Sequence, residues 1–227
     1  DLLRAAPEFV ARMTWLLANR PRLAALVSHW QEPGQAATRL LSLLRGHRLK
    51  RLLYRMLDTA EFLSDYGVRS LSRVYLDKPY VFRDTDITVG YQPAESSTDL
   101  FGGNSNWRGP IWLPINFLII ESLQRFHHYY GDDFKVEYPT HSGQYATLLE
   151  VADALTARLT KLFLRDPATG RRACFGDSEL LQHDPNFKDN LFFHEYFNGD
   201  NGHGLGASHQ TGWTGLIAKL LQPRGHR

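Results

Sequence analysis

The chain has 227 residues, of which 43% are hydrophobic and 22% charged, as in a folded protein with one sizeable core. Its 26 lysines and arginines nearly balance 24 aspartates and glutamates, so the net charge of +2 argues against a nucleic-acid partner. The single cysteine, Cys174, excludes an internal disulfide and favours a reducing compartment. We therefore expect a cytoplasmic protein.

The start of the chain and its apolar runs bear on targeting. The sequence begins at Asp1 rather than methionine, and no signal-peptide pattern precedes Leu2, so we expect a piece of a longer protein. The longest apolar run, residues 111–120, is about half a membrane span. Pro114 and Asn116 interrupt it. We expect no membrane partner.

The first part of the chain, residues 1–66, has the apolar periodicity of helices. Phe9 and Met13 belong to a series of apolar residues three and four positions apart, and Pro21 predicts the start of a new helix. A long amphipathic helix is predicted over residues 47–63, with the basic residues near its start on the solvent-exposed face.

The rest of the chain alternates helices with long loops. β-Forming residues on both sides of a polar turn predict a small hairpin within residues 75–91. A loop rich in Ser, Gly and Asn follows over 93–110, and helices are predicted over 111–130, 151–164 and 210–221. Gly109-Pro110 and Gly131 are typical start and stop residues for the first of these helices. Loops this long are more often functional than accidental.

The stretch LFFHEYFNGDNGHGLGASHQTGWTG, residues 191–215, points to carbohydrate chemistry. It sets the carboxylate of Glu195 among aromatic residues, and glycines follow at 199, 202, 204 and 206. Glycoside hydrolysis uses two carboxyl groups, one to protonate the leaving oxygen and one to activate water. Aromatic neighbours shield a carboxyl group from water, which raises its pKa, and glycines let the backbone approach a ligand closely. The stretch predicts a sugar site around Glu195.

Other interpretations of this stretch fail on spacing. Its glycines fit a dinucleotide-binding pattern loosely, but no acid follows about 20 residues later. His194-Glu195 opens like a zinc-protease motif, but Asn198 stands where the second histidine is required. The turn around Asp200 lacks the glutamate that closes a calcium loop. We therefore expect neither a metal nor a cofactor.

A second unusual stretch, FGGNSNWRGPIW, covers residues 101–112. The simplest structural interpretation makes Asn106 or Gly109 the helix cap and Trp107 and Trp112 core residues. It leaves Arg108, between the two tryptophans, without a role. Tryptophan faces stack on the C–H faces of sugars, and asparagine and arginine hydrogen-bond sugar hydroxyls. This loop is a second candidate for sugar binding.

Together the two stretches resemble a known family. WRGPIW at 107–112, with HEYF at 194–197 and HQTGWTG at 209–215, is similar to the C-terminal half of the catalytic domain of glycoside hydrolase family 63. That family includes the processing α-glucosidase that trims N-glycans and bacterial relatives, some of which act on mannosylglycerate-type compounds. The resemblance covers nearly the whole chain and is clearest over 65–221.

The resemblance implies an all-α fold, part of an (α/α)6 barrel, and inverting hydrolysis of α-glucosidic or α-mannosidic bonds in oligosaccharides or small glycosides. The family's general base is the glutamate of an E-x-Y segment before the glycine-rich turn, which implies this role for Glu195, although Tyr196-Phe197 replaces x-Y. The implied substrate-binding residues are Asn106, Trp107, Arg108, Trp112, Tyr196 and Trp213.

One departure from the family concerns the general acid. The family takes it from an aspartate in a Gly-Trp-Asp segment that this sequence lacks, and the sequence predicts only about half of the helices of such a barrel. We therefore expect residues 1–227 to be the C-terminal part of a single catalytic domain, with the N-terminal remainder supplying the acid. Glu95 and Asp99 are the local candidates for a substitute acid.

Two other function classes stay open at this point. A helical carbohydrate-binding module without catalysis would use Glu195 only to accept hydrogen bonds from sugar hydroxyls. A purely structural helical domain would have a featureless surface around Trp107 and Trp213. A Gly-Trp-Asp segment in frame upstream would favour the enzyme.

Overall fold

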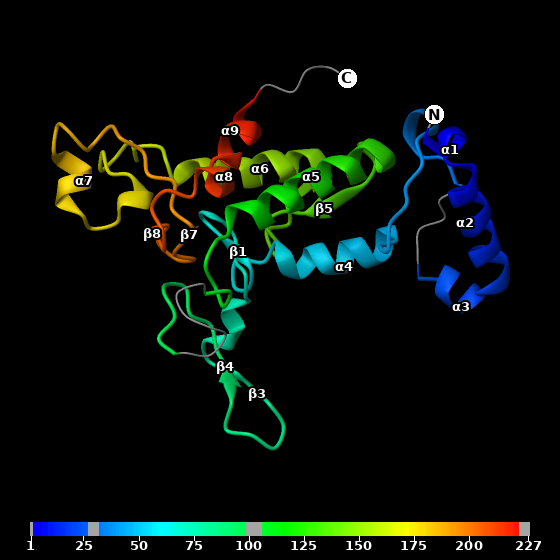
Figure 1. The fold of residues 1–227 in the computed structure, drawn as a ribbon, viewed down its shortest axis with the longest axis horizontal. Helices are drawn as coiled ribbons and strands as arrows, with labels where there is room; N and C mark the ends of the chain where they lie inside the picture. Colours follow the sequence, from blue (N-terminus) through cyan, green and yellow to red (C-terminus); the bar gives the residue numbers. More distant parts are fainter. Residues whose placement is uncertain (1, 27–31, 99–105, 223–227) are drawn as a thin grey trace.

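The computed structural model describes residues 2–26, 32–98 and 106–222. It is helix-rich, and the strands of the described residues form four two-stranded antiparallel hairpins rather than a larger sheet. Three helices, α4 (Gly46–Met56), α5 (Leu113–Tyr130) and α6 (Leu148–Lys161), run through the middle of an elongated molecule (Figure 1). This agrees with the helix-rich fold that the sequence predicts.

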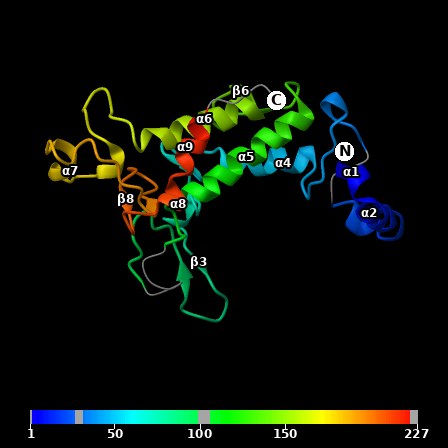
Figure 2. The same ribbon diagram turned by 45° about the horizontal axis from the view of Figure 1, so that its top comes forward.

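Smaller elements surround these three helices. α1 (Leu2–Ala5), α2 (Pro7–Asn19) and α3 (Pro21–Ala24) lie together at one end of the molecule, and α7 (Glu179–His183) lies at the other (Figure 1, Figure 2). The C-terminal α8 (Thr211–Thr214) packs against α5, and α9 (Leu216–Leu221) packs against α5 and α6. Short 3-10 turns occur at Gln35–Ala37, Arg73–Tyr75 and Ala173–Phe175. Among the described helices, none combines the length and the apolar character needed to cross a bilayer.

The ends of α5 and α6 follow from local sequence signals. α5 has Pro114 in its first turn and ends at Gly131, whose φ of 72° suits glycine, so the prediction over 111–130 is confirmed to within two residues. α6 begins with a capping box, in which Thr147 Oγ1 accepts from the Glu150 amide at 3.2 Å and Glu150 Oε2 accepts from the Thr147 amide at 2.7 Å. This box starts the helix three residues before the predicted position.

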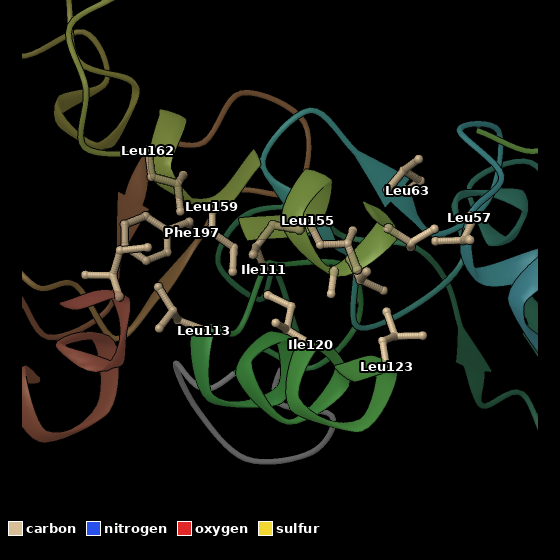
Figure 3. Close-up of a cluster of buried hydrophobic side chains, with 14 of the residues drawn as sticks. Leu57, Leu63, Ile111, Leu113, Ile120, Leu123, Leu155, Leu159, Leu162 and Phe197 are labelled. Carbon is tan, nitrogen blue, oxygen red and sulfur yellow. The ribbon is translucent and has the colours of Figure 1, made fainter. Parts of the chain in front are cut away.

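The hydrophobic core joins this helix pair to the hairpins. α5 and α6 face one another along their apolar sides. Leu113, in the first turn of α5, extends the core toward Phe197 (Figure 3). The labelled members of the core are Leu57, Leu63, Ile111, Leu113, Ile120, Leu123, Leu155, Leu159, Leu162 and Phe197. Apolar burial is the main stabilising term in folding. The hairpins over residues 63–68 and 196–205 are therefore stabilised mainly through their packing on α5 and α6.

The helix predicted over 47–63 ends early, and that prediction is wrong in its second half. α4 stops at Met56, after which Asp58 Oδ1 accepts from the Ala60 amide at 2.8 Å and Asp58 O accepts from the Leu63 amide at 2.9 Å. An aspartate side chain that bonds nearby amides competes with the helix. The chain then forms a hairpin of β1 (Leu63–Ser64) and β2 (Gly67–Val68).

The other hairpins fall partly where the sequence predicts them. β3 (Tyr80–Val81) pairs with β4 (Thr88–Val89), which confirms the hairpin expected within 75–91, and it projects away from the core (Figure 1). Two hairpins occupy segments predicted as loops, β5 (Lys135–Glu137) with β6 (Tyr145–Thr147) and β7 (Tyr196–Phe197) with β8 (Gly204–Leu205). The helix predicted over 210–221 is divided at Gly215 into α8 and α9.

Asn116, on the buried face of α5, ties this helix to β2. Its Oδ1 accepts from the Val68 amide at 2.7 Å, and its Nδ2 donates to Val68 O and to Trp112 O, both at 3.0 Å. The side chain is almost fully buried. It therefore satisfies both backbone polar groups of a residue that water does not reach.

We predict that Asn116→Leu, which keeps a similar volume, destabilises the protein by about 2–5 kcal/mol, because it leaves two buried backbone groups of Val68 without partners. The control is Ser122→Ala on the exposed side of the same helix, where the hydroxyl bonds only Leu118 O. This change should stay within about 0.5 kcal/mol. Urea unfolding followed by tryptophan fluorescence measures both, and equal stabilities would contradict the prediction.

Candidate functional site

The two unusual sequence stretches are direct neighbours in the structure. The Ile111 amide donates to Phe197 O at 2.8 Å, and the Phe197 amide donates to Ile111 O at 3.0 Å. A third hydrogen bond joins the Gly199 amide to Pro93 O at 2.9 Å. The tryptophan-rich loop and the segment that carries Glu195 therefore form one structural unit.

Glycines make the close contact between the two stretches sterically possible. A Cβ on Gly199 would lie 2.3 Å from Gly109 O, and a Cβ on Gly109, where φ is +147°, would lie 2.7 Å from the Tyr91 ring. Neither position has room for a side chain. These two glycines serve the packing of one loop on the other.

An aromatic cluster forms where the two stretches meet. Trp107 stacks on Trp112 with ring centroids 3.9 Å apart and planes 2° from parallel, and Trp112 stacks on Tyr196 at 4.7 Å. Trp213 meets Trp112 edge-on at 6.1 Å. Trp112 and Tyr196 are buried, whereas Trp107 is 44% and Trp213 37% exposed. The buried pair supports two aromatic residues that solvent can reach, as the stacking of a sugar requires.

Asn106 is hydrogen-bonded to Trp112 of this cluster and shapes a neighbouring loop. Its Nδ2 donates to Gln92 O at 2.7 Å and to Ala94 O at 2.6 Å, and its own carbonyl accepts from Trp112 Nε1 at 2.9 Å. The N-cap residue of α5 is Trp112, without a side-chain capping bond. Asn106 is therefore a loop organiser rather than a helix cap.

Arg108 is buried as well, and it holds the same loop. Its guanidinium donates to Ser96 Oγ and, at 3.2 Å, to Thr98 Oγ1, and its backbone amide donates to Asn106 Oδ1 at 3.0 Å. Burial lowers the pKa of this guanidinium. These bonds keep residues 92–98 next to the aromatic cluster, which gives the arginine between the tryptophans a role in shaping the site.

Glu195 directly precedes β7, next to Tyr196 of the cluster, and its backbone pairs with Ala207, which follows β8. Its amide donates to Ala207 O at 2.8 Å, and its Oε2 lies 3.4 Å from the Ala207 amide. Gly206 has φ of +67°, and a Cβ there would lie 2.7 Å from Glu195 Oε2. The glycine after β8 therefore leaves the space that the carboxylate occupies.

A second carboxylate approaches the same part of the site. Burial raises the pKa of Tyr196 to about 12, and the negative charges of Glu95 and Glu195 add to this shift. The charge of Glu95 therefore acts on the same hydroxyl as the charge of Glu195. Glu95 is exposed on the loop that Arg108 holds. Asp99, the other candidate for a substitute acid, lies outside the described residues.

His194, beside Glu195, is a half-buried residue whose two ring nitrogens are both buried. Neither ring nitrogen has a hydrogen-bond partner in the described part of the chain, and the ring lies between Phe192 and Phe197. Burial lowers its pKa to about 4, with smaller contributions from His203 and His209. At neutral pH the His194 ring is therefore uncharged and packs against its aromatic neighbours.

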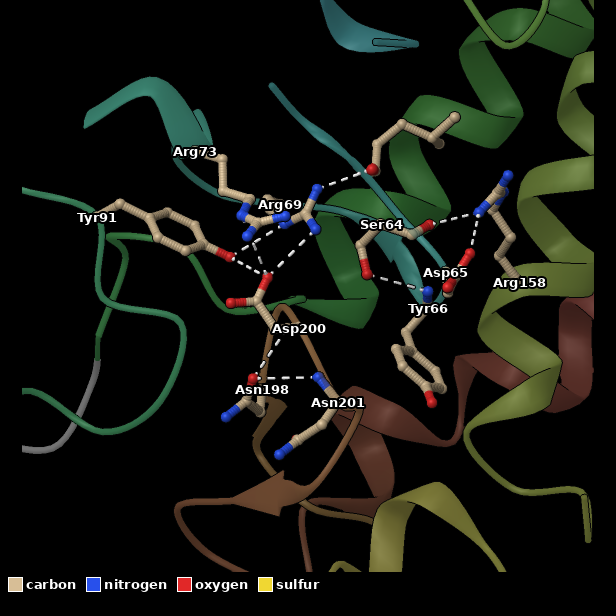
Figure 4. A network of polar contacts seen from close by, with 11 residues as sticks. Ser64, Asp65, Tyr66, Arg69, Arg73, Tyr91, Arg158, Asn198, Asp200 and Asn201 are labelled. Atoms are coloured by element: carbon tan, nitrogen blue, oxygen red, sulfur yellow. Dashed lines mark hydrogen bonds and ion pairs between the residues drawn. The ribbon is translucent and has the colours of Figure 1, made fainter. Parts of the chain in front are cut away.

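Sequence reasoning missed a polar network at the turn of the β7–β8 hairpin. Arg69, Tyr91 and Asp200 meet there, although they come from three separate segments (Figure 4). In the sequence, Asp200 was a candidate only for a calcium-binding loop, and Arg69 belongs to no motif. Across residues 2–26, 32–98 and 106–222, no group of three or more His, Cys, Asp or Glu side chains is arranged to hold a metal ion.

Comparison with known proteins identifies the family. Residues 37–149, which include the tryptophan-rich loop, match the glycosyl hydrolase family 63 C-terminal domain. The chain belongs to glycosyl hydrolase family 63. The family that the sequence motifs indicate is therefore confirmed.

Two yeast proteins are similar to this family 63 chain. An uncharacterized protein of Saccharomyces cerevisiae is 48% identical over 99% of this chain and 21% of its own length. The mannosyl-oligosaccharide glucosidase of the same yeast is 24% identical over 77% of this chain and 15% of its own length. The chain thus spans about a fifth or less of the length of the curated relatives it matches.

We predict that Gly206→Ala destabilises the protein more than Gly170→Ala. Both glycines have φ near +70°, but nothing lies within 4 Å of a Cβ on Gly170, whereas a Cβ on Gly206 meets Glu195 Oε2. Backbone strain should cost about 1–2 kcal/mol at either site. The clash should add about 1–3 kcal/mol at Gly206 alone. Urea unfolding tests this, and equal losses would mean that the carboxylate can move aside freely.

Proposed function

We propose that this chain is the part of an inverting α-glycosidase that carries the general base, acting on α-glucosidic or α-mannosidic bonds in oligosaccharides or small glycosides. The observation that supports this most is Glu195 at the edge of an aromatic cluster with two solvent-accessible tryptophans, in a family 63 chain. The similarity to a mannosyl-oligosaccharide glucosidase favours a glucoside over a mannoside.

In this mechanism Glu195 removes a proton from a water molecule as that water attacks the anomeric carbon. The water must lie between the base and an acid on the opposite face of the sugar, with the two carboxyl groups roughly 6.5–9.5 Å apart. Trp107 and Trp213 would stack on sugar rings and hold the bond in line with Glu195. Tyr196 keeps its proton at neutral pH, so it adds no negative charge beside the base.

We propose further that residues 1–227 are the C-terminal part of a single (α/α)6 barrel domain whose N-terminal remainder supplies the acid. Ile115 and Leu118 support this proposal, because they are exposed on α5 next to residues buried in the core. In a complete barrel such a helix side is covered by neighbouring helices. The single cysteine, buried at position 174, supports a cytoplasmic location.

A carbohydrate-binding module without catalysis is the second candidate. The exposed tryptophans favour it as much as they favour an enzyme, because stacking serves binding in either case. The role of Glu195 separates the two, since a binding module needs only hydrogen bonds from that side chain.

We predict that Glu195→Gln in the full-length protein lowers kcat by about 10²–10⁴-fold and leaves KM nearly unchanged, because activation of water occurs only in the transition state. Hydrolysis of a panel of α-glucosides and α-mannosides measures both constants. Glu179→Gln, an exposed glutamate on α7, is the control and should leave both constants as they are. Full activity of Glu195→Gln would rule out this residue as the base.

We also predict that the chain alone hydrolyses none of these substrates and that the N-terminal half, added in trans, restores turnover. An inverting reaction without its general acid lacks one of its two proton transfers. Glu95→Gln provides the control, because Glu95 is the described carboxylate that shares the surroundings of Tyr196 with Glu195. Turnover by the chain alone that disappears in Glu95→Gln would instead assign the acid to Glu95.

A further inference from the structure

An ion pair between a buried arginine and a partly exposed aspartate joins the turn of the β7–β8 hairpin to the rest of the site. Arg69 Nη2 lies 3.2 Å from Asp200 Oδ1, the Tyr91 hydroxyl donates to the same oxygen at 2.9 Å, and Arg69 Nε donates to the Tyr91 hydroxyl at 3.0 Å (Figure 4). Arg69 also donates to Leu63 O at 2.7 Å. Arg73 approaches Asp200 to 3.9 Å from the solvent side. Asp200 is thus held from three directions.

The opposite charges of Arg69 and Asp200 favour this contact and also make it specific. Arg69 is only 7% exposed, and a buried guanidinium is costly unless an anion and hydrogen bonds satisfy it. Hydrogen bonds between charged groups fix direction as well as distance. Tyr91 packs its ring against Gly109, so the network also touches the loop that carries Trp107 and Trp112. Asp200 is therefore fixed relative to both halves of the site.

The hairpin between Asp200 and Glu195 is a short, well-bonded unit. Asn198 Oδ1 accepts from the amides of Asp200 at 2.8 Å and Asn201 at 3.3 Å, and the Asn198 amide donates to His203 O at 2.8 Å. At the other end, Glu195 pairs with Ala207 through its amide. A displacement of the turn is therefore transmitted along the strands.

The bonds between Phe197 and Ile111 lie between the two ends of this unit. Glu195 precedes Phe197 by two residues, and Asp200 follows it by three. The hairpin is thus held at its middle by two backbone hydrogen bonds, and at its turn by Asp200 and by the bond from the Gly199 amide to Pro93 O. If Asp200 is removed, the turn is held less firmly, and we expect the hairpin to tilt about Phe197 and to move Glu195 at its opposite end.

We propose that Asp200, with Arg69 and Tyr91, is a positioning residue that sets the location of Glu195 beside the aromatic cluster. This inference rests on the proposed function, in which Glu195 is the general base. Asp200 does not touch the reacting atoms in this proposal and acts only through the orientation of the hairpin.

Asp200→Ala, Asp200→Asn and Tyr91→Phe in the full-length protein test this inference. Asp200→Ala should lower kcat by about 10- to 100-fold, because a displacement of about 1 Å in a catalytic group costs this much. KM should hardly change, since Trp107 stacks directly on Trp112 and the Ile111–Phe197 bonds still hold their loop when Asp200 is removed. Asp200→Asn keeps an acceptor for Arg69 and Tyr91 and should retain much of the lost kcat. Tyr91→Phe, which removes one donor, should give an intermediate kcat.

Asp65→Ala is the matched control. Asp65 pairs with Arg158 at 3.1 Å, and this arginine is also largely buried, but the pair lies outside the β7–β8 hairpin (Figure 4). The control should leave kcat and KM unchanged. A comparable loss of kcat in this variant would mean that any broken ion pair has the effect, and it would overturn the inference.

Further outcomes would also overturn the inference. A folded Asp200→Ala protein with unchanged kcat, or one with raised KM and unchanged kcat, would exclude a positioning role. Should Asp200→Ala fail to fold, unchanged kcat in both Asp200→Asn and Tyr91→Phe would exclude it instead. Glu195→Gln in the same series separates the two proposals. If that variant is inactive while Asp200→Ala is fully active, the positioning role alone fails, whereas an active Glu195→Gln overturns the base assignment and this inference with it.

Discussion

The backbone pairing of Ile111 with Phe197 is the contact on which the rest of the site depends. Both residues are fully buried, and their two hydrogen bonds set the tryptophan-rich loop in register with the Glu195 segment. Ile111 also forms an isolated bridge with Arg69 on its other side. The neighbours of the paired residues, Trp112 and Tyr196, then meet face to face. One short pairing therefore brings together the aromatic cluster, the segment that carries Glu195 and the turn at which Asp200 meets Arg69.

Buried polar side chains make such an irregular site stable. The segments around it have little regular secondary structure, so their backbone groups need other partners. Asn106 supplies them for the loop at 92–98, and Asn116 supplies them for β2. Burying an asparagine side-chain amide costs little free energy when all of its hydrogen bonds are made. Removing that side chain leaves several buried backbone groups without partners. The asparagines and arginines that resemble sugar ligands in the sequence are thus also the framework of the loops.

The glycines likewise have a role in packing as well as the role that the sequence suggests. In the sequence they suggest close approach of the backbone to a ligand, whereas Gly109 and Gly199 allow two loops to touch one another. Gly206 leaves space for the Glu195 carboxylate. In each case a side chain would displace a part of the candidate site, so these glycines shape that site through the packing of the protein itself.

The sequence by itself determined the elements whose signals are local. Pro114 and Gly131 mark α5, and β-forming residues around a turn mark the β3–β4 hairpin. The resemblance of two stretches to a known family indicates that family and a candidate base. Local spacing also allowed one error, because nothing in the apolar pattern reveals that Asp58 ends α4. Tertiary structure alone decided the inward orientation of Arg108, the pairing of Ile111 with Phe197 and the meeting of Asp200 with Arg69 and Tyr91. The last two contacts join segments that are far apart along the chain, and such contacts depend on how the helices pack rather than on any periodicity of the sequence.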